Sequence, residues 1–298
     1  MFPVIVVKIF HVMKTLAKIG LGLGTLVLAG LYSYQSSLIY PSSLNNGRES
    51  CSTPDEYGMD YELIELHTED GETLQCFSLK QDKTSPTYTN KTIVVLSPNA
   101  GNIGHALPIV SIFYKNFGYN VFIYSYRGYG KSTGSPSEKG IKIDSQTVMK
   151  YLDNDEQYRE SSVILYGRSL GGAVAIYMAA TMSSSVSAVI LENTFLSIRK
   201  TVPHIFPFLK YCTMFVHQIW DSESLVPEIP ENIPFLLFSG RKDEIVPPEH
   251  MDKIRDMLGG DKTFVTFEQG THNDTITQEG YWEKVQEFVR DKVNPVGY

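Results

Sequence analysis

Apolar residues recur along this chain in short continuous runs, and stretches with helical spacing separate most of these runs. The runs occupy residues 92–97, 119–126, 161–167, 186–193, 234–240 and 262–268. Continuous apolar runs are typical of strands that are buried on both faces, and intervening helices are the usual connection between parallel strands. The pattern predicts the α/β class, with a mostly parallel sheet and helices on both of its faces.

The segment before these runs has a different pattern. Residues 61–79 alternate apolar and polar side chains around Asp70-Gly71, which is typical of a β-hairpin. A polar linker over residues 40–57 precedes the hairpin, so we expect the globular domain to cover residues 58–298.

A long insertion, over about residues 197–232, interrupts the alternation of strands and helices and separates two predicted strands. We expect this insertion to form a small helical cap over the sheet. Its aromatic residues suggest contact with an apolar substrate, although cap helices that bury their own apolar faces would show the same composition. These residues are Phe206, Phe208, Tyr211, Phe215 and Trp220.

Residues 19–39 carry no charge, and a helix of this length would extend about 30 Å, enough to cross a bilayer core. They predict an N-terminal transmembrane helix after an N-terminal segment over residues 1–18. Lys8, Lys14 and Lys18 precede the apolar stretch, so the positive-inside rule places residues 1–18 in the cytosol. We therefore expect a single-pass type II protein of the endoplasmic reticulum, another endomembrane or the plasma membrane, with a lumenal or extracytosolic catalytic domain.

Two alternatives to an anchor stay open, a cleaved signal peptide and a mitochondrial presequence. Both also begin with a positively charged, apolar stretch that lacks acidic residues. The absence of arginine before Arg48 disfavours a presequence, and the length of the uncharged run disfavours a cleaved signal.

Composition and charge narrow the function classes. The net charge of −7, without a cluster of basic residues, excludes the electrostatic pattern of nucleic-acid binding. Cys51, Cys76 and Cys212 do not have the paired spacing of a zinc site, and they leave room for one disulfide at most.

Ser169 is the strongest candidate for a catalytic residue. It lies where a β-branched run gives way to an alanine-rich helical stretch, within Gly167-Arg168-Ser169-Leu170-Gly171. This sequence matches the G-x-S-x-G nucleophile elbow, in which a strand-to-helix turn exposes the serine hydroxyl. The residues two before and two after the serine must be small, because strand and helix approach each other closely there.

A nucleophilic serine needs a base and an acid that orients the base. In this architecture the order is serine, acid, histidine, each in a loop after a strand. Asp243 and His272 follow the last two predicted strands and fit that order. Glu192, Glu244 and Asp274 stay open as alternative acids, whereas His67, His204, His217 and His250 do not follow a late strand.

The oxyanion of such a reaction needs backbone N–H donors. The residue after the nucleophile, Leu170, supplies one, and Asn99 or Ala100, in the loop after residues 92–97, is expected to supply the second. Residues 127–140 contain Gly130-Lys131-Ser132 but lack the first glycine of a phosphate-binding loop. We interpret them as a surface turn beside the site.

Five segments together, PNAGNIGH, YRGYGKSTG, GRSLGGAVAIYMA, ENTFLSI and GTHNDT, resemble a group of α/β-hydrolases. This group contains alpha/beta-hydrolase domain-containing protein 13 and the fungal bud-emergence protein 46, and the resemblance covers about residues 64–289. It implies a serine hydrolase with Ser169, Asp243 and His272 as its triad. Relatives commonly carry His-Gly before the oxyanion loop, where this chain has Ser97 and Pro98.

The sequence thus predicts a membrane-anchored serine hydrolase that cleaves a carboxylic ester or thioester of an apolar acyl group. The expected partners are a small-molecule or lipid acyl ester and the membrane, with no metal, organic cofactor or nucleic acid. An acyl-protein thioesterase and a non-catalytic scaffold on a hydrolase fold are the alternatives.

Overall fold

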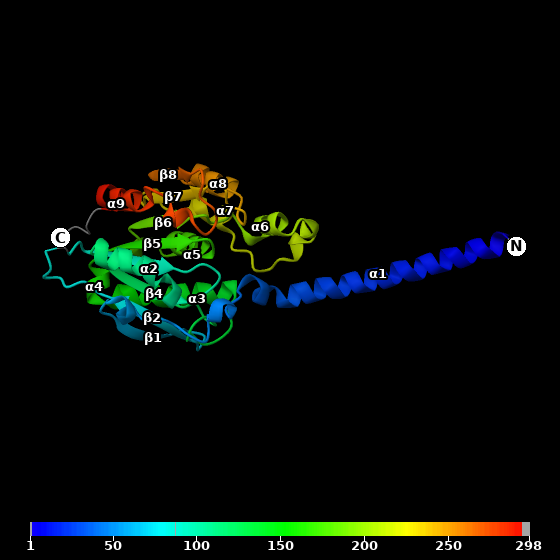
Figure 1. The fold of residues 1–298 in the computed structure, drawn as a ribbon, viewed down its shortest axis with the longest axis horizontal. Helices are drawn as coiled ribbons and strands as arrows, with labels where there is room; N and C mark the ends of the chain where they lie inside the picture. The colour runs from blue at the N-terminus through cyan, green and yellow to red at the C-terminus, as the bar shows by residue number, and fades with distance from the viewer. Residues whose placement is uncertain (1, 87, 294–298) are drawn as a thin grey trace.

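Eight strands form one sheet in the part of the chain that the computed structural model describes, residues 2–86 and 88–293 (Figure 1). Met1, at the start of the predicted N-terminal segment, and residues 294–298, at the end of the predicted globular domain, lie outside the described residues. The strands are β1 (Glu62–His67), β2 (Thr73–Leu79), β3 (Lys91–Leu96), β4 (Asn120–Tyr124), β5 (Ser162–Arg168), β6 (Ala188–Glu192), β7 (Phe235–Gly240) and β8 (Lys262–Phe267).

The strand order is β1-β2-β4-β3-β5-β6-β7-β8. Only β2, among the described strands, runs antiparallel to its neighbours β1 and β4, and every later pairing is parallel. The predicted hairpin and the predicted mostly parallel sheet are confirmed. Strands β4, β6 and β7 are buried along their whole length, as the continuous apolar runs require.

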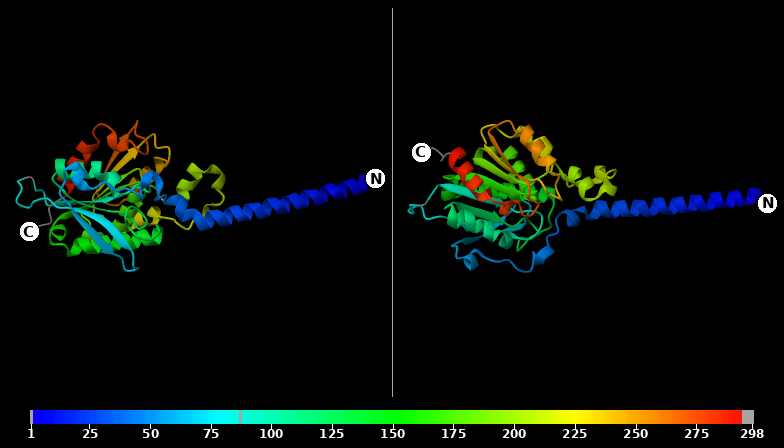
Figure 2. Two further views of the ribbon diagram at one scale, coloured as in Figure 1. Left: turned by 60° about the horizontal axis from the view of Figure 1, so that its bottom comes forward. Right: turned by 45° about the horizontal axis from the view of Figure 1, so that its top comes forward.

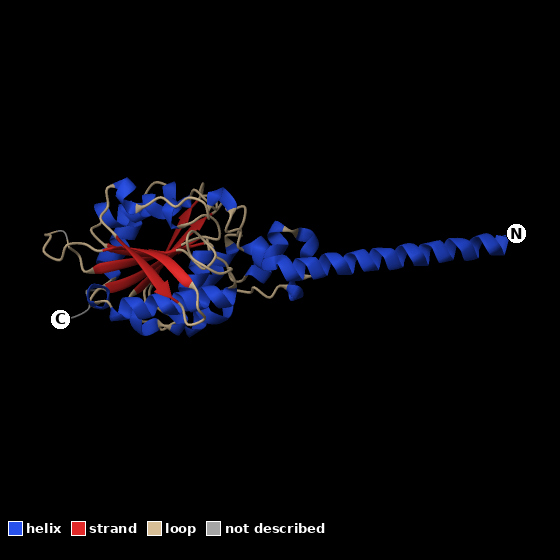
Figure 3. Cartoon of the chain, turned by 90° about the horizontal axis from the view of Figure 1, so that it is seen from below, coloured by secondary structure: helices blue, strands red, loops and turns tan. Residues whose placement is uncertain are grey.

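Helices cover both faces of the sheet (Figure 3). The core on one face packs against α3 (Glu138–Asn154), α5 (Leu170–Thr181) and α8 (Glu249–Met257). The core on the other face packs against α2 (Leu107–Ser111) and α9 (Tyr281–Lys292). Shorter helical elements are α4 (Glu156–Arg159), η1 (Leu44–Asn46), η2 (Pro54–Tyr57), η3 (Ile103–Ala106), η4 (Ile112–Asn116), η5 (Ser183–Ser185) and η9 (Thr275–Thr277).

The insertion between β6 and β7 consists of short helices. These are α6 (Ile198–Ile205), η6 (Pro207–Leu209), η7 (Thr213–Phe215), α7 (Ser222–Leu225) and η8 (Val226–Glu228). Trp220 is buried, whereas Phe206, Phe208, Tyr211 and Phe215 are 46% to 81% exposed. Most of these aromatic side chains therefore do not pack into the cap itself.

The N-terminal helix α1 (Phe2–Ile39) projects away from the sheet, and its C-terminal end lies beside the cap (Figures 1 and 2). Among the described residues, no helix is both long and apolar enough to cross a membrane. The predicted transmembrane helix over residues 19–39 is therefore not supported. The type II topology stays a prediction. Four glycines and the polar side chains from Tyr32 to Ser37 lower the apolarity of this stretch.

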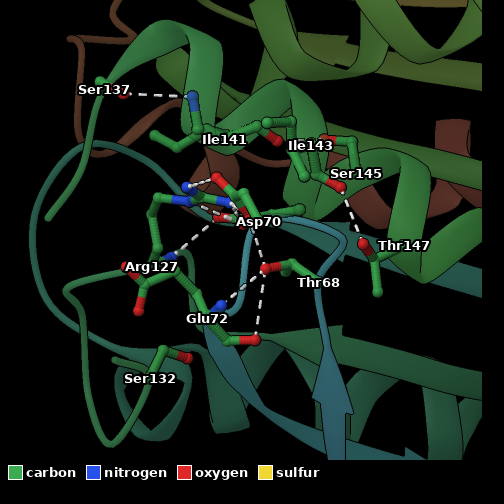
Figure 4. Close-up of polar contacts among 12 residues, drawn as sticks. Thr68, Asp70, Glu72, Arg127, Ser132, Ser137, Ile141, Ile143, Ser145 and Thr147 are labelled. Atoms are coloured by element: carbon green, nitrogen blue, oxygen red, sulfur yellow. Dashed lines mark hydrogen bonds and ion pairs between the residues drawn. The ribbon is translucent and has the colours of Figure 1, made fainter. Parts of the chain in front are cut away.

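The loop after β4 was interpreted as a surface turn over residues 127–140. Residues 127–130 are buried, whereas Lys131, Thr133 and Ser135 are exposed, so the interpretation fits only the later part of the loop. The Arg127 guanidinium donates hydrogen bonds to both carboxylate oxygens of Asp70, at 2.6 and 2.9 Å (Figure 4). It donates another to Asp144 at 2.9 Å. The Arg127 hydrogen bond holds the pKa of Asp70 well below its usual range. These contacts tie the loop to the β1–β2 turn and to α3.

Candidate active site

Ser169 lies at the sharp turn between β5 and α5. Its φ angle of 54° is rare for a residue with a side chain and indicates backbone strain. A Cβ atom at Gly167 would lie 2.2 Å from the carbonyl oxygen of Gly171, and one at Gly171 would lie 2.0 Å from that of Leu96. Only glycine fits at these two positions, which is the steric requirement that the sequence indicated.

The structure brings Ser169, His272 and Asp243 into one chain of hydrogen bonds. Nε2 of His272 lies 3.1 Å from Oγ of Ser169, and Nδ1 of His272 lies 2.8 Å from Oδ2 of Asp243. All three residues are buried. Oδ1 of Asp243 accepts hydrogen bonds from the backbone N–H groups of Ile245 and Val246, which fix the orientation of the carboxylate. The geometry can move a proton from the serine to the histidine.

The other acidic candidates have different partners. Glu244 accepts a hydrogen bond from the backbone N–H of His272, and Asp274 accepts one from the backbone N–H of Thr271. Glu192 is fully buried and accepts hydrogen bonds from two tyrosine hydroxyls. Burial raises the pKa of the Glu192 carboxyl. Of these four carboxylates, Asp243 is the one that forms a hydrogen bond with the His272 ring.

The other histidine candidates lie in other elements of the fold. His250 lies in α8, where its Nδ1 accepts a hydrogen bond from the backbone N–H of Leu196. His67 ends β1, and His204 and His217 belong to the cap.

Asn193 was not singled out from the sequence, although it lies within the segment ENTFLSI. Its side-chain amide donates hydrogen bonds to the carbonyl oxygens of Thr271 and His272 and to the Thr275 hydroxyl, and its oxygen accepts one from the N–H of Gly240. Asn193 thereby connects the loop of the histidine to the end of β7, which leads to Asp243. Its φ angle of 47°, a conformation that Asn tolerates better than most residues, was not readable from the sequence.

The neighbouring Thr194 supports the serine itself. Its hydroxyl donates a hydrogen bond to the carbonyl oxygen of Ser169 at 2.7 Å. A Cβ atom at Gly172 would lie 2.5 Å from Cβ of Thr194, so close packing holds the start of α5 against the end of β6.

A cavity of about 240 Å³ opens over Ser169. Leu170 and Asn99 line it together with Ser169, whereas Ala100 is not among its lining residues. Leu170 is the first residue of α5, so its N–H has no acceptor within the helix. The Asn99 side chain donates a hydrogen bond to the carbonyl oxygen of Ile39, and Tyr129 donates one to the carbonyl oxygen of Asn99. These contacts hold the predicted oxyanion loop over the serine.

Neither a metal centre nor a disulfide is present in the described part of the chain. Within residues 2–86 and 88–293, no group of three or more His, Cys, Asp or Glu side chains is placed to hold a metal ion. Cys51, Cys76 and Cys212 are unpaired.

The strand order, the elbow at Ser169 and the loops that follow β7 and β8 define an α/β hydrolase. A family model described as alpha/beta hydrolase fold matches residues 93–213. The chain belongs to this family, in the group of the Schizosaccharomyces pombe protein bem46, to which it is 42% identical over 95% of both chains. The resemblance found in the sequence is confirmed.

Other relatives agree with this assignment. The chain is 47% identical to the Saccharomyces cerevisiae uncharacterized membrane protein YNL320W, over 91% of this chain and 94% of the relative. It is 35% identical to the Arabidopsis thaliana alpha/beta hydrolase domain-containing protein WAV2, over 90% and 92%. The structure superposes on the Pyrococcus furiosus esterase Pf2001 with a TM-score of 0.68, at 20% identity over 82% of this chain and 95% of the esterase. At this identity the superposition shows the fold alone.

Proposed function

We propose that this protein is a serine hydrolase that cleaves a carboxylic ester or thioester through an acyl-enzyme. The observation that carries the proposal is the chain of hydrogen bonds from Ser169 through His272 to Asp243. A scaffold without activity would not need a strained serine aligned with a buried histidine and carboxylate.

In the proposed mechanism, Oγ of Ser169 attacks the acyl carbon while Nε2 of His272 takes the hydroxyl proton. Asp243 orients the imidazole and stabilises its positive charge. The N–H groups of Leu170 and of Asn99 or Ala100 hold the oxyanion. His272 then gives its proton to the leaving alcohol or thiol, and water, activated by the same histidine, releases the acyl group.

The lining of the cavity supports an apolar acyl group. Apart from Ser169, Asn99 and a few polar side chains, leucine, isoleucine, valine and phenylalanine residues surround it. Burial of an acyl chain against such residues is favourable by about 0.8 kcal/mol per methylene. A polar acyl group would lose its hydration there without gaining hydrogen bonds.

Turnover of p-nitrophenyl esters by the full-length protein tests this function. We expect the wild type and the variant Ser184→Ala, which changes an exposed serine, to hydrolyse the ester at equal rates. Ser169→Ala should lose turnover. Turnover by Ser169→Ala within about tenfold of the wild type would mean that Ser169 is not the nucleophile.

We propose in addition that the end of the molecule formed by α1 and the cap contacts a membrane surface. Phe208 and Tyr211 are 76% and 81% exposed, and Leu21 and Leu26 of α1 are 75% and 70% exposed. Exposed apolar groups of this kind are favoured at a lipid interface. The name of the yeast relative as a membrane protein supports the same setting.

Flotation with lipid vesicles tests the membrane contact. We expect the wild type to float with the vesicles and the double variant Phe208→Ser and Tyr211→Ser to remain in the soluble fraction. Equal recovery of both proteins in the soluble fraction would contradict the contact. Protease treatment of intact microsomes then assigns the side: protection supports an extracytosolic domain, and digestion supports the acyl-protein thioesterase alternative.

A further inference from the structure

The C-terminal turns of α1 line the cavity over Ser169. Leu28, Leu31, Gln35 and Ile39 all contribute to its wall, together with residues of the cap. Their spacing of three or four residues places them on one face of the helix. The helix that the sequence indicated as a separate segment thus supplies one side of the candidate active site.

Specific hydrogen bonds hold this part of α1 in place. The side-chain amide of Gln35 is buried, accepts a hydrogen bond from the N–H of His217 at 2.8 Å and donates one to the carbonyl oxygen of Phe215 at 3.2 Å. Nε1 of Trp220 donates a hydrogen bond to the Tyr40 hydroxyl at 2.8 Å, and both side chains are buried. The end of α1 and Tyr40, which follows it, are therefore fixed to the cap.

The position of α1 relative to Ser169 indicates the direction in which a bound acyl chain can extend. Ile39 lies at the oxyanion loop, because its carbonyl oxygen accepts the hydrogen bond from Asn99. Leu28 lies about 16 Å further along the helix axis, at a rise of about 1.5 Å per residue. An acyl chain that leaves the reacting carbon at Ser169 can extend along this face of α1, past Leu31 and toward Leu28.

We propose that α1 forms a wall of the acyl-binding pocket, and that Leu31 and Leu28 set the length of the acyl chain that the enzyme accepts. The proposal rests on the proposed hydrolase function. It identifies the substrate class as esters or thioesters of medium-chain or longer fatty acids. Both leucines are half-buried, so a larger side chain at either position would narrow the cavity without disrupting the sheet.

Hydrolysis of p-nitrophenyl acetate, octanoate and dodecanoate by the full-length protein tests the proposal. For Leu31→Trp and Leu28→Trp we expect kcat/KM for p-nitrophenyl dodecanoate to fall by roughly tenfold or more. The kcat/KM for p-nitrophenyl acetate should change by less than about twofold. The control is Leu63→Trp, since Leu63 of β1 is 55% exposed and does not line the cavity. It should keep the wild-type profile.

A binding measurement separates this proposal from the proposed hydrolysis. Calorimetric titration of the free fatty acid dodecanoate into the Ser169→Ala variant measures binding without turnover. We expect binding by Ser169→Ala and by its combination with Leu63→Trp. Binding should be lost when Ser169→Ala is combined with Leu31→Trp or Leu28→Trp. This pattern without esterase activity in the wild type would retain the pocket and overturn the hydrolase function. Equal binding by all of these variants, or an unchanged chain-length profile, would overturn the role of α1.

Discussion

The Nδ1 atom of His272 lies 2.8 Å from Oδ2 of Asp243, and two backbone N–H groups hold the other oxygen of that carboxylate. This arrangement fixes which imidazole nitrogen faces Ser169. It requires the proton to reside on Nδ1, so that Nε2 is free to accept the proton of the serine.

Asp243→Asn should therefore lower kcat by about a thousandfold or more, with a small effect on KM. The amide can present an N–H to Nδ1 and favour the wrong tautomer. Glu192→Gln is the matched control, because Glu192 has tyrosine partners and its pKa is already raised by burial. Steady-state kinetics compare the two, and a greater loss at Glu192 would move the acid to the end of β6.

Asn193→Asp tests how the loops that carry Asp243 and His272 are held together. Aspartate keeps the acceptor for the N–H of Gly240 and loses the donors to the carbonyl oxygens of Thr271 and His272. We expect kcat to fall by about ten- to a hundredfold through displacement of His272. Thermal unfolding is measured alongside. A folded variant with the kcat of the wild type would show that Asn193 does not position the histidine.

Asn99→Ala tests the link between α1 and the oxyanion loop. The substitution removes the hydrogen bond to the carbonyl oxygen of Ile39 and leaves the backbone N–H in the chain. We expect kcat to fall about tenfold with KM nearly unchanged, because a mobile donor stabilises the transition state less well. Tyr129→Phe removes the other hydrogen bond to Asn99 and should act in the same direction. Wild-type kinetics in both variants would contradict this link.

His250 makes stability depend on pH. Burial, with Lys253 and Lys200 nearby, lowers its pKa from 6.5 to about 4. Between these values the unfolded chain binds a proton that the folded protein does not, so stability should decrease as the pH falls through this window. The amide oxygen of His250→Asn can still accept from the N–H of Leu196 and does not titrate. Denaturation midpoints at about pH 7 and about pH 5 should therefore differ less in this variant than in the wild type. An equal difference in both would contradict the role of His250.

The sheet and the meeting of Ser169, Asp243 and His272 could be predicted because they depend on local patterns. Buried parallel strands are apolar throughout, and the loops that follow them meet at one edge of the sheet. The conformation of Asn193 and the burial of Arg127 depend on contacts between segments distant in sequence. The position of α1 beside the cavity also depends on such contacts. The sequence alone does not show whether the leucines of this helix face lipid, solvent or a cavity.

Covalent labelling with a fluorophosphonate probe, followed by mass spectrometry of the intact protein and of its peptides, tests directly whether Ser169 is the nucleophile. We expect one adduct per chain, located on Ser169, in the wild type and in the exposed-site control Ser184→Ala. We expect no adduct on Ser169→Ala, with unfolding close to that of the wild type because only one hydroxyl is removed. An adduct that persists in Ser169→Ala, or a folded wild type that takes up no probe, would contradict the assignment of Ser169 as the nucleophile.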